Sequence, residues 1–221
     1  MAKENATIIA VDKNEQSVNL VKNALKETNH SAFKMDITKS ENIHNVVKKI
    51  LALYEKPPSI IVNCAGITMD SFMINMTEDS FDKVIDVNLK GTYLITQHFA
   101  KLLLERNITG SIVNVGSIIG KIGNIGQCNY AASKAGVELI TKTAAKEFGR
   151  YGIRCNVVLP GFIQTPMVET VPEKVKEMFS KQIGLKRLGQ PEEVAEVITF
   201  LASDKSSYVN GASIEVTGGG L

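Results

Sequence analysis

The sequence predicts an α/β protein whose strands form a doubly wound parallel sheet in one domain spanning residues 1–221. Short strand-like runs alternate along the chain with segments of helical periodicity. Connections of helical length favour parallel strands with helices on both faces of the sheet. No repeat, low-complexity tract or linker-like stretch divides the 221 residues, so a single domain is expected.

Six short runs, most of them rich in valine, isoleucine and threonine, predict the strands. Such side chains suit a pleated sheet, and each run is followed by turn-forming residues. Pro160 and Gly161 end the fifth run, and three glycines follow the last one. The expected strands lie at residues 7–11, 32–35, 60–63, 111–115, 153–159 and 213–216.

Five segments with apolar residues every three or four positions predict helices. Thr38 and Glu41 form a capping box before the second helix, and Pro57 ends it. Asn88 and Gly91 are expected to interrupt the third helix, since asparagine and glycine disfavour helix interiors. The expected helices lie at residues 17–28, 43–54, 78–104, 129–148 and 191–202, with a mixed segment at 166–184.

Charge and composition exclude several classes of function. The 25 basic and 23 acidic residues are interspersed and leave a net charge of +2, which gives no general attraction for nucleic acid or an anionic membrane. No apolar run approaches the roughly 18 residues of a membrane span. Three scattered cysteines and three separate histidines indicate neither a disulfide framework nor a metal site, and they favour a reducing compartment. No targeting segment is visible.

Small and polar residues gather at the expected carboxyl ends of the strands, where open α/β sheets bind their ligands. Each residue alone fits ordinary turn chemistry, because glycine, asparagine, aspartate and proline supply special backbone angles. Their recurrence at nearly every strand end favours a ligand site. The residues concerned are Asp12, Asp36, Asn63, Ala65, Gly66, Gly116, Ser117, Pro160 and Gly161.

A tyrosine and a lysine four residues apart carry the candidate chemistry. Tyr130 and Lys134 lie on one face of an expected helix, where both can reach the same ligand. An ammonium about 4 Å from the phenol would favour the phenolate of Tyr130 by roughly three pKa units, which reaches a useful range when the positive nicotinamide of a cofactor is counted as well. Ser117 at a strand end and Asn88 at a helix break add polar groups. The competing interpretation is a surface pair, a turn residue and a helix breaker.

Taken in order, these residues resemble the motifs of the short-chain dehydrogenase/reductase family. The resemblance covers the chain from residue 1 to the C-terminus, and it implies a Rossmann-like sheet. It also implies that Tyr130 passes a proton to or from the substrate oxygen, that Ser117 stabilises this oxygen, and that Asn88 holds a water linking Lys134 to solvent. The motifs are Asn63-Cys-Ala-Gly66, Asn88 in Val87-Asn-Leu-Lys-Gly91, Ser117, Tyr130-Ala-Ala-Ser-Lys134 and Pro160-Gly161.

The resemblance further implies a cofactor and a substrate. Hydride would pass between NAD and either a 17β-hydroxysteroid or a 3-hydroxyacyl thioester of coenzyme A or a carrier protein. Asp12 is placed to accept hydrogen bonds from the adenosine ribose and to repel a 2′-phosphate, which favours NAD over NADP. An apolar substrate lid is expected at residues 166–185. The implied cofactor-binding residues are Asp12, Asp36, Ile37, Asn63, Ala65, Gly66, Tyr130, Lys134, Pro160, Gly161, Ile163 and Thr165.

Assembly and location are expected from the same resemblance. The chain would form a homotetramer, or a heterotetramer with a related reductase subunit, through the helices at 88–104 and 130–148 and the last strand. The mitochondrial matrix is the expected compartment, with the cytoplasm as the alternative, and neither nucleic acid nor a membrane is an expected partner. Four basic residues either meet the phosphates of the substrate carrier or are solvated charges: Lys121, Arg154, Lys186 and Arg187.

One feature of the family pattern is absent. Gly66 is the first glycine of the chain, so the glycine-rich turn after a first strand does not occur in these 221 residues. The chain is expected to lack the first β-α unit of the fold, about thirty residues, including the helix N-terminus that cradles pyrophosphate. Two strand edges would then be unpaired, and NAD binding would weaken by about three orders of magnitude. The alternative function is a non-catalytic subunit that keeps the fold and oligomer surfaces but binds the cofactor poorly.

Overall fold

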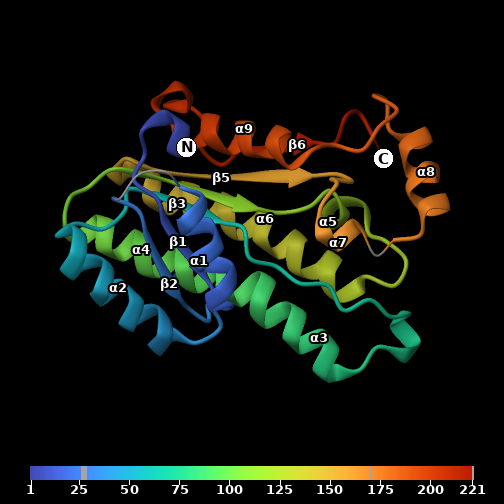
Figure 1. Cartoon of the computed structure of the whole chain (residues 1–221), viewed down its shortest axis with the longest axis horizontal. Coiled ribbons are helices and arrows are strands. Elements are labelled where there is room, and N and C mark those ends of the chain that lie inside the picture. The colour runs from blue at the N-terminus through green and yellow to red at the C-terminus, as the bar shows by residue number, and fades with distance from the viewer. Residues whose placement is uncertain (26–28, 170, 221) are drawn as a thin grey trace.

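Parallel strands alternate with covering helices along the chain. The computed structural model describes residues 1–25, 29–169 and 171–220 (Figure 1). Its strands are β1 (Ile9–Asp12), β2 (Ser31–Lys34), β3 (Ile60–Asn63), β4 (Gly110–Val115), β5 (Ile153–Pro160) and β6 (Ser213–Val216). Its α-helices are α1 (Glu15–Ala24), α2 (Ser40–Tyr54), α3 (Glu78–Ile85), α4 (Thr92–Glu105), α5 (Ile119–Ile122), α6 (Cys128–Phe148), α7 (Pro166–Glu169), α8 (Glu173–Gln182) and α9 (Pro191–Ala202).

Helices bury both faces of the strands around β5. Cys155 packs into a core shared with α2, α4 and α6, whereas Val158 packs into a second core with α9. Both side chains are fully buried, and so are the three other residues between positions 155 and 159. A parallel strand covered on both faces is expected to be mainly apolar, and Asn156 is the one polar residue in this run. The fold class predicted from the sequence is therefore confirmed.

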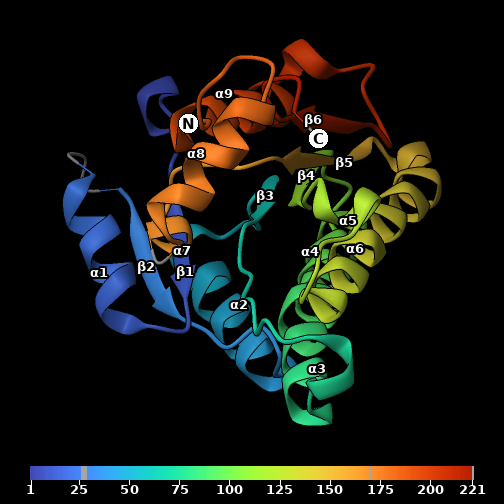
Figure 2. The same ribbon diagram turned by 90° about the vertical axis from the view of Figure 1, so that its right-hand side faces the viewer.

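The strands form two sheets rather than one. β3, β4, β5 and β6 pair in that order with parallel registers, and β1 pairs with β2 in a separate parallel sheet. Figure 2 shows β1 and β2 on the left, apart from the other four strands. The expectation of two unpaired strand edges is confirmed, and these edges belong to β1 and β3.

The helix after β1 starts earlier than its periodicity predicts. The Asn14 side chain accepts hydrogen bonds from the backbone N–H groups of Gln16 and Ser17, so α1 begins at Glu15. This cap satisfies two of the donors that a helix N-terminus leaves open. The last three residues of the predicted helix, 26–28, lie outside the described residues.

The predicted capping box of the second helix is wrong. The Thr38 hydroxyl donates to Asp36 at 2.7 Å, and the Thr38 backbone N–H donates to the same oxygen at 3.0 Å. The helix α2 instead begins at Ser40, with Lys39 in the cap position and no side-chain cap. A local turn at Asp36 thus uses the threonine that the sequence pattern assigns to the helix.

The expected interruption at Asn88 and Gly91 is a change of winding and not a break. The segment Asp86–Gly91 forms a π-helical turn that joins α3 to α4. The Thr92 hydroxyl donates to the Asn88 backbone oxygen at 2.8 Å, which satisfies an acceptor inside the turn. Gly91 is needed because an added Cβ would lie 2.6 Å from Ile37 Cδ1. Such turns frequently occur at functional sites.

The predicted mixed segment contains the short helices α7 and α8, although Thr170 between them lies outside the described residues. Phe179 of α8 stacks on Phe162, with the ring centroids 4.5 Å apart, and so docks this helix beside the end of β5. None of the helices within the described ranges has the length and apolar character to cross a membrane.

Candidate active site

The centre of the site lies between the carboxyl end of β4 and the first turns of α6. Ser117 follows β4 by two residues, and Tyr130 and Lys134 lie one helical turn apart on α6. The Lys134 ammonium lies 5.7 Å from the centroid of the Tyr130 ring. Ser117 and Tyr130 are joined by a side-chain hydrogen bond. The structure therefore brings together the serine, tyrosine and lysine that the sequence singles out.

Lys134 is buried, and its ammonium donates to a backbone oxygen. Its side chain is 4% exposed, and Nζ donates to the Val115 oxygen at 2.7 Å. Burial lowers the pKa of Lys134 to about 8, because desolvation disfavours the charged form, while the nearby Cys64 thiol acts in the opposite direction. An ammonium has three donors, so two of them remain for a polar ligand beside Val115.

The pKa of Tyr130 is raised in the chain without ligands. Burial raises the pKa of the phenol above its ordinary value, the Ser117 hydrogen bond lowers it, and the charge of Asp70 raises it. The Lys134 ammonium lies 5.7 Å from the centroid of the ring and is itself desolvated. The expected lowering of this pKa counts the positive nicotinamide of a bound cofactor together with Lys134, so it stays a prediction for the occupied site.

Asn88 ties the π-helical turn to the loop after β3 and to α6. Its Oδ1 accepts from the Ile67 N–H at 2.8 Å, and its Nδ2 donates to the Ile67 oxygen and to Ser133 Oγ, both at 3.0 Å. Asn88 is fully buried. These bonds occupy both polar atoms of its side chain, so Asn88 holds the site together. Its expected role in a water relay stays a prediction.

Gly66 leaves a narrow space against the centre of the site. An added Cβ at this position would lie 3.4 Å from both Asn88 Oδ1 and Lys134 Nζ. Ala65 beside it is exposed, so the backbone at positions 65 and 66 is open to a ligand. A flat backbone surface with a lysine ammonium at its edge fits the ribose and nicotinamide end of a dinucleotide, which presents hydroxyl groups to such a donor.

The acidic residues expected at the adenosine end lie at the ends of β1 and β2. Asp12 is exposed, and one of its carboxylate oxygens accepts the Asn14 N–H at 2.7 Å. The pKa of Asp36 is lowered: burial alone would raise it, but hydrogen bonds from Thr38 and the charge of Lys13 outweigh burial. Asp36 is therefore held by its own turn, whereas Asp12 keeps an oxygen open to solvent.

Two further predicted cofactor residues face the protein interior. Ile37 packs against the π-helical turn at Gly91. The Asn63 side chain donates to Asn114 Oδ1 at 2.8 Å and to Thr96 Oγ1 at 3.3 Å, within the layer between the sheet and its helices. The structure thus engages the Asn63 side chain within the protein, and its expected contact with a cofactor stays a prediction.

The predicted residues after β5 lie at the carboxyl end of the four-stranded sheet. The Pro160 oxygen accepts the Ile118 N–H at 3.0 Å, which fixes the loop after Ser117 against β5. The Gly161 N–H donates to the Val216 oxygen, so β6 is bound to the same point. Ile163 is buried, and the Thr165 oxygen accepts the N–H of Val168 in α7.

Two residues that position Tyr130 were missed in the sequence. Asn129 is fully buried; its Oδ1 accepts the Tyr130 N–H at 2.7 Å, and its Nδ2 donates to the oxygens of Met69 and Ser80. Ser133 donates to the Tyr130 oxygen at 2.7 Å and accepts from Asn88. The only available signal was their position next to the tyrosine and the lysine.

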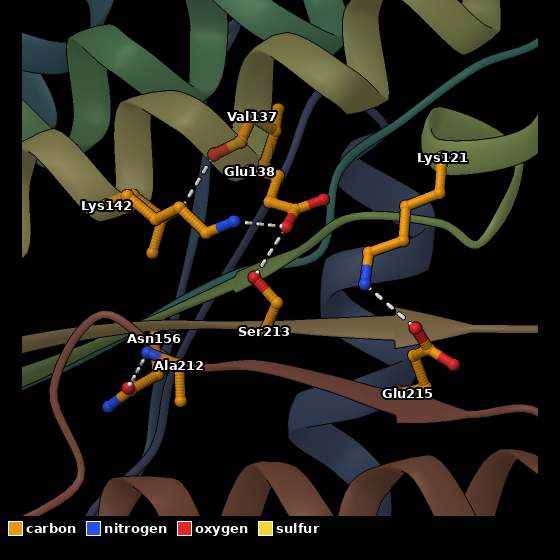
Figure 3. Close-up of polar contacts among 9 residues, drawn as sticks. Lys121, Val137, Glu138, Lys142, Asn156, Ala212, Ser213 and Glu215 are labelled. Atoms are coloured by element: carbon orange, nitrogen blue, oxygen red, sulfur yellow. Dashed lines mark hydrogen bonds and ion pairs between the residues drawn. The ribbon is translucent and has the colours of Figure 1, made fainter.

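Charged side chains hold β6 onto α5 and α6 (Figure 3). The Glu138 carboxylate accepts from Lys142 Nζ at 2.6 Å and from Ser213 Oγ at 2.8 Å, and Lys121 pairs with Glu215 at 2.8 Å. Burial raises the pKa of Glu138, but the bonds from Lys142 and Ser213 outweigh it and lower this pKa below its ordinary value. The helix α5, which follows Ser117 closely, is thereby fixed to the sheet.

The basic residues considered for phosphate binding are engaged within the protein. Lys121 pairs with Glu215, and Arg187 makes a two-pronged pair with Glu193. Arg154 donates to the backbone oxygens of Leu201 in the last turn of α9 and of Ser203 just after it, and Lys186 donates to the Lys181 oxygen. Their contacts support a structural interpretation over a phosphate site.

Comparison with known proteins agrees with this geometry. Residues 1–220 match the protein family described as Enoyl-(Acyl carrier protein) reductase. The chain is 49% identical over 228 residues to the (3R)-3-hydroxyacyl-CoA dehydrogenase of Homo sapiens, covering 99% of this chain and 87% of the relative. It is 47% identical over 223 residues to the 3-oxoacyl-[acyl-carrier-protein] reductase FabG of Thermotoga maritima, covering 99% and 89%. It is 58% identical over 133 residues to the Estradiol 17-beta-dehydrogenase 8 of Callithrix jacchus, covering 60% and 99%.

Proposed function

The chain belongs to the short-chain dehydrogenase/reductase family and is an oxidoreductase; from this premise we propose that its cofactor is NAD and its substrate a 3-hydroxyacyl thioester. The observation that carries the proposal is the hydrogen bond between Ser117 and Tyr130 beside the buried Lys134. The relatives that match nearly the whole chain are named for 3-hydroxyacyl and 3-oxoacyl substrates, which favours these over a 17β-hydroxysteroid.

Each residue of the centre has a distinct role in the proposed reaction. NAD supplies the hydride acceptor when it is bound. Ser117 donates its hydrogen bond to the substrate oxygen, where negative charge develops during carbonyl reduction. Tyr130 holds the proton that is exchanged with that oxygen. Burial keeps the phenol protonated, so in the reductive direction it is ready to donate.

Lys134 holds the ligand and balances charge at Tyr130. Its remaining donors would bind the ribose hydroxyls of the cofactor; the backbone oxygen of Val115 takes one donor, and Gly66 lies close to the ammonium. In the oxidative direction Tyr130 must first lose its proton. The raised pKa of Tyr130 in the chain without ligands means that positive charge at the nicotinamide end is needed to favour the phenolate.

Substitution of Tyr130 tests the proposed chemistry. We expect Tyr130→Phe to lower the rate of NADH oxidation with acetoacetyl-CoA by about 10²- to 10⁴-fold, because it removes the transferred proton and keeps the ring. The matched control is Tyr208→Phe, since Tyr208 is fully exposed and distant in sequence from the site. Equal rates for Tyr130→Phe and the parent chain would refute the proposal. It would also be refuted if Tyr208→Phe lost as much activity as Tyr130→Phe.

Substitution of Asp12 tests the proposed preference for NAD. Asp12→Asn keeps an oxygen for the Asn14 N–H and removes the charge that repels a 2′-phosphate. We expect the ratio of kcat/KM for NADH over NADPH to fall by about tenfold, which corresponds to the loss of one charge repulsion of roughly 1.4 kcal/mol. Asp204→Asn, which removes an exposed carboxylate in the turn after α9, is the matched control. An unchanged ratio in Asp12→Asn would mean that another residue selects the cofactor.

A second candidate function is a subunit that keeps the fold and assembles with an active reductase but binds cofactor poorly. One observation favours it: the strands form two separate sheets, which are divided beside Asp12. Calorimetric titration of the chain with NAD separates the two functions. A micromolar dissociation constant supports the enzyme, whereas absent binding together with stable assembly with a related reductase supports the subunit.

A further inference from the structure

Three consecutive residues of the loop after β3, at positions 69–71, are joined to the segment that begins α6. Two of them contribute backbone groups, whereas Asp70 contributes a charged side chain. The three hydrogen bonds run from the Ser71 N–H to the Gly126 oxygen at 2.8 Å, from Gln127 Nε2 to Asp70 Oδ2 at 2.9 Å, and from Asn129 Nδ2 to the Met69 oxygen at 3.0 Å. The loop therefore places one carboxylate beside the first turn of the helix that carries Tyr130.

Gln127 holds this carboxylate in place. It occupies the N-cap position of α6 and makes no side-chain hydrogen bond to the helix itself. Its Nε2 donates to Asp70, and its Oε1 accepts from Asn124 Nδ2 at 2.9 Å. Both polar atoms of the cap side chain are thus used outside the helix. Their effect is to fix the exposed Asp70 carboxylate at the helix N-terminus.

The charge of Asp70 opposes the charge of the helix end. Tyr130 is the third residue of α6, and side chains in a helix lean toward its N-terminus. The first turn of a helix carries partial positive charge, which favours the phenolate of Tyr130. Asp70 brings a full negative charge to the same turn through Gln127, three positions before Tyr130. A negative charge disfavours the phenolate, so it favours retention of the phenol proton.

Other charged groups surround α6, but several of them are paired. The pairs are Asp79–Lys83 on α3, Asp86–Lys90 on the π-helical turn and Lys121–Glu215 between α5 and β6. Glu78 and Asp82, the other acids of α3, are exposed, and their charges do not act on the phenol.

Asp70 differs from these groups because its charge does act on the phenol. Burial is the largest cause that raises the pKa of Tyr130; the Ser117 hydrogen bond lowers this pKa, and the charge of Asp70 raises it further. Lys134 lies beside the Tyr130 ring with the Cys64 thiol as a neighbour, and it is itself desolvated. Among the described residues, Asp70 is therefore the charged side chain that helps to keep the proton on Tyr130.

We propose that Asp70 is a positioning residue for the reaction: held by Gln127 at the N-terminus of α6, its charge keeps the proton on Tyr130 and sets the pH range in which Tyr130 can donate it. The inference rests on the proposed function. After Tyr130 gives its proton to the substrate oxygen, the same charge favours return of a proton from solvent to the phenolate.

Ultraviolet titration of tyrosinate tests the proposal without any turnover. Asp70→Asn keeps an oxygen for the Gln127 bond and removes only the charge. Subtracting the titration of a matched chain with Tyr130→Phe isolates Tyr130, in the parent and in the Asp70→Asn background. At a fixed pH below the midpoint, the phenolate fraction of Tyr130 should be about two- to fivefold larger in Asp70→Asn, as expected for one partly screened charge.

Asp82→Asn is the matched control, because Asp82 is an exposed acid on α3, which packs against α6. Its phenolate fraction should equal that of the parent chain, and circular dichroism checks that each chain is folded over the pH range. An unchanged fraction in Asp70→Asn overturns the proposal, and so does an equal change in Asp82→Asn.

The pH dependence of kcat/KM for acetoacetyl-CoA reduction gives a second readout. In Asp70→Asn the activity should decline at a lower pH than in the parent, while the plateau near neutral pH changes by no more than about twofold. A lowered plateau with an unmoved midpoint also overturns the proposal, because Asp70 would then only hold the loop. The tyrosinate titration decides on Asp70 even if the proposed reaction itself is wrong, so the two failures are distinguishable.

Discussion

At the scale of single residues, the charge of Lys134 lies where solvent cannot stabilise it. A buried ammonium with one backbone acceptor costs stability, and the same desolvation leaves it ready to bind a polar ligand. Tyr130 shows the complementary effect, since burial holds its proton in place. Asn129 and Ser133 fix the backbone of Tyr130 by short hydrogen bonds, so the geometry of the centre depends on neighbours as much as on the reacting groups.

The buried ammonium makes stability depend on pH. The pKa of Lys134 is about 8 in the folded chain, whereas in the unfolded chain it has its ordinary value of 10.5. Between these two pH values the unfolded chain therefore holds one proton more than the folded chain. Stability therefore rises with pH in this range. Relative to Lys134→Met, the free energy of unfolding of the parent chain should rise by about 3 kcal/mol between pH 7 and 10.5.

Denaturant titrations at a series of pH values measure this difference. Lys146→Met is the control, because Lys146 lies on the same helix and is exposed. Its difference from the parent chain should not change with pH. A constant difference for Lys134→Met as well would show that Lys134 stays charged throughout the range.

At the scale of elements, the site depends on the close approach of short segments. The π-helical turn brings Asn88 to α6, and the short helix α5 packs directly on α6 at Gly120. An ion pair between Lys121 of α5 and Glu215 of β6 also holds α5 against the sheet. Ser117 is placed by this arrangement, because it lies between β4 and α5.

Gly120 tests how far the packing of α5 positions Ser117. An added Cβ would lie 2.7 Å from the Ala135 nitrogen and 2.8 Å from the Lys134 carbonyl carbon, both backbone atoms that cannot move freely. We expect Gly120→Ala to destabilise the fold by about 1–3 kcal/mol and to lower kcat more than it raises KM, since Ser117 is displaced from Tyr130.

A neighbouring substitution supplies the control for Gly120. Lys121→Ala removes only a partly exposed ion pair, for which about 0–1 kcal/mol is expected. Denaturant titration and steady-state kinetics of both variants give the comparison. Similar kcat values in Gly120→Ala and Lys121→Ala would contradict a positioning role for this contact.

At the scale of the whole molecule, the division between two sheets is the main feature. The catalytic centre belongs to the four-stranded sheet, whereas Asp12 and Asp36 belong to the end of the two-stranded one. The two parts share an apolar core, in which Met35 and Ile43 pack with residues of α4 and β5. Binding of a cofactor that contacts both sheets therefore depends on how well this core fixes the position of one sheet relative to the other.

Assembly belongs to the same scale. We propose a tetramer formed through α4, α6 and β6, and Leu139 on α6 is 64% exposed in the single chain. Leu139→Glu should shift the sedimentation coefficient from that of a tetramer toward smaller species, because a charge would be buried in the contact. Leu20→Glu on α1 is a matched control, since Leu20 is 71% exposed. Equal sedimentation of both variants and the parent would place the contact elsewhere.

The sequence by itself determined the alternation of strands and helices, the family, and the identity of Ser117, Tyr130 and Lys134. These features depend on local periodicity and on spacing along one helix or strand end, which can be read without knowing what lies nearby.

Only the tertiary structure decided the properties that arise from distant contacts. It showed that Thr38 caps no helix, that the helix at Asn88 continues through a π-helical turn, and that Asn129 clamps Tyr130 to the loop after β3. It also showed that the pKa of Tyr130 is raised in the chain without ligands. That direction depends on how much solvent the folded chain removes from the phenol, and the spacing of Tyr130 and Lys134 carries no information about burial.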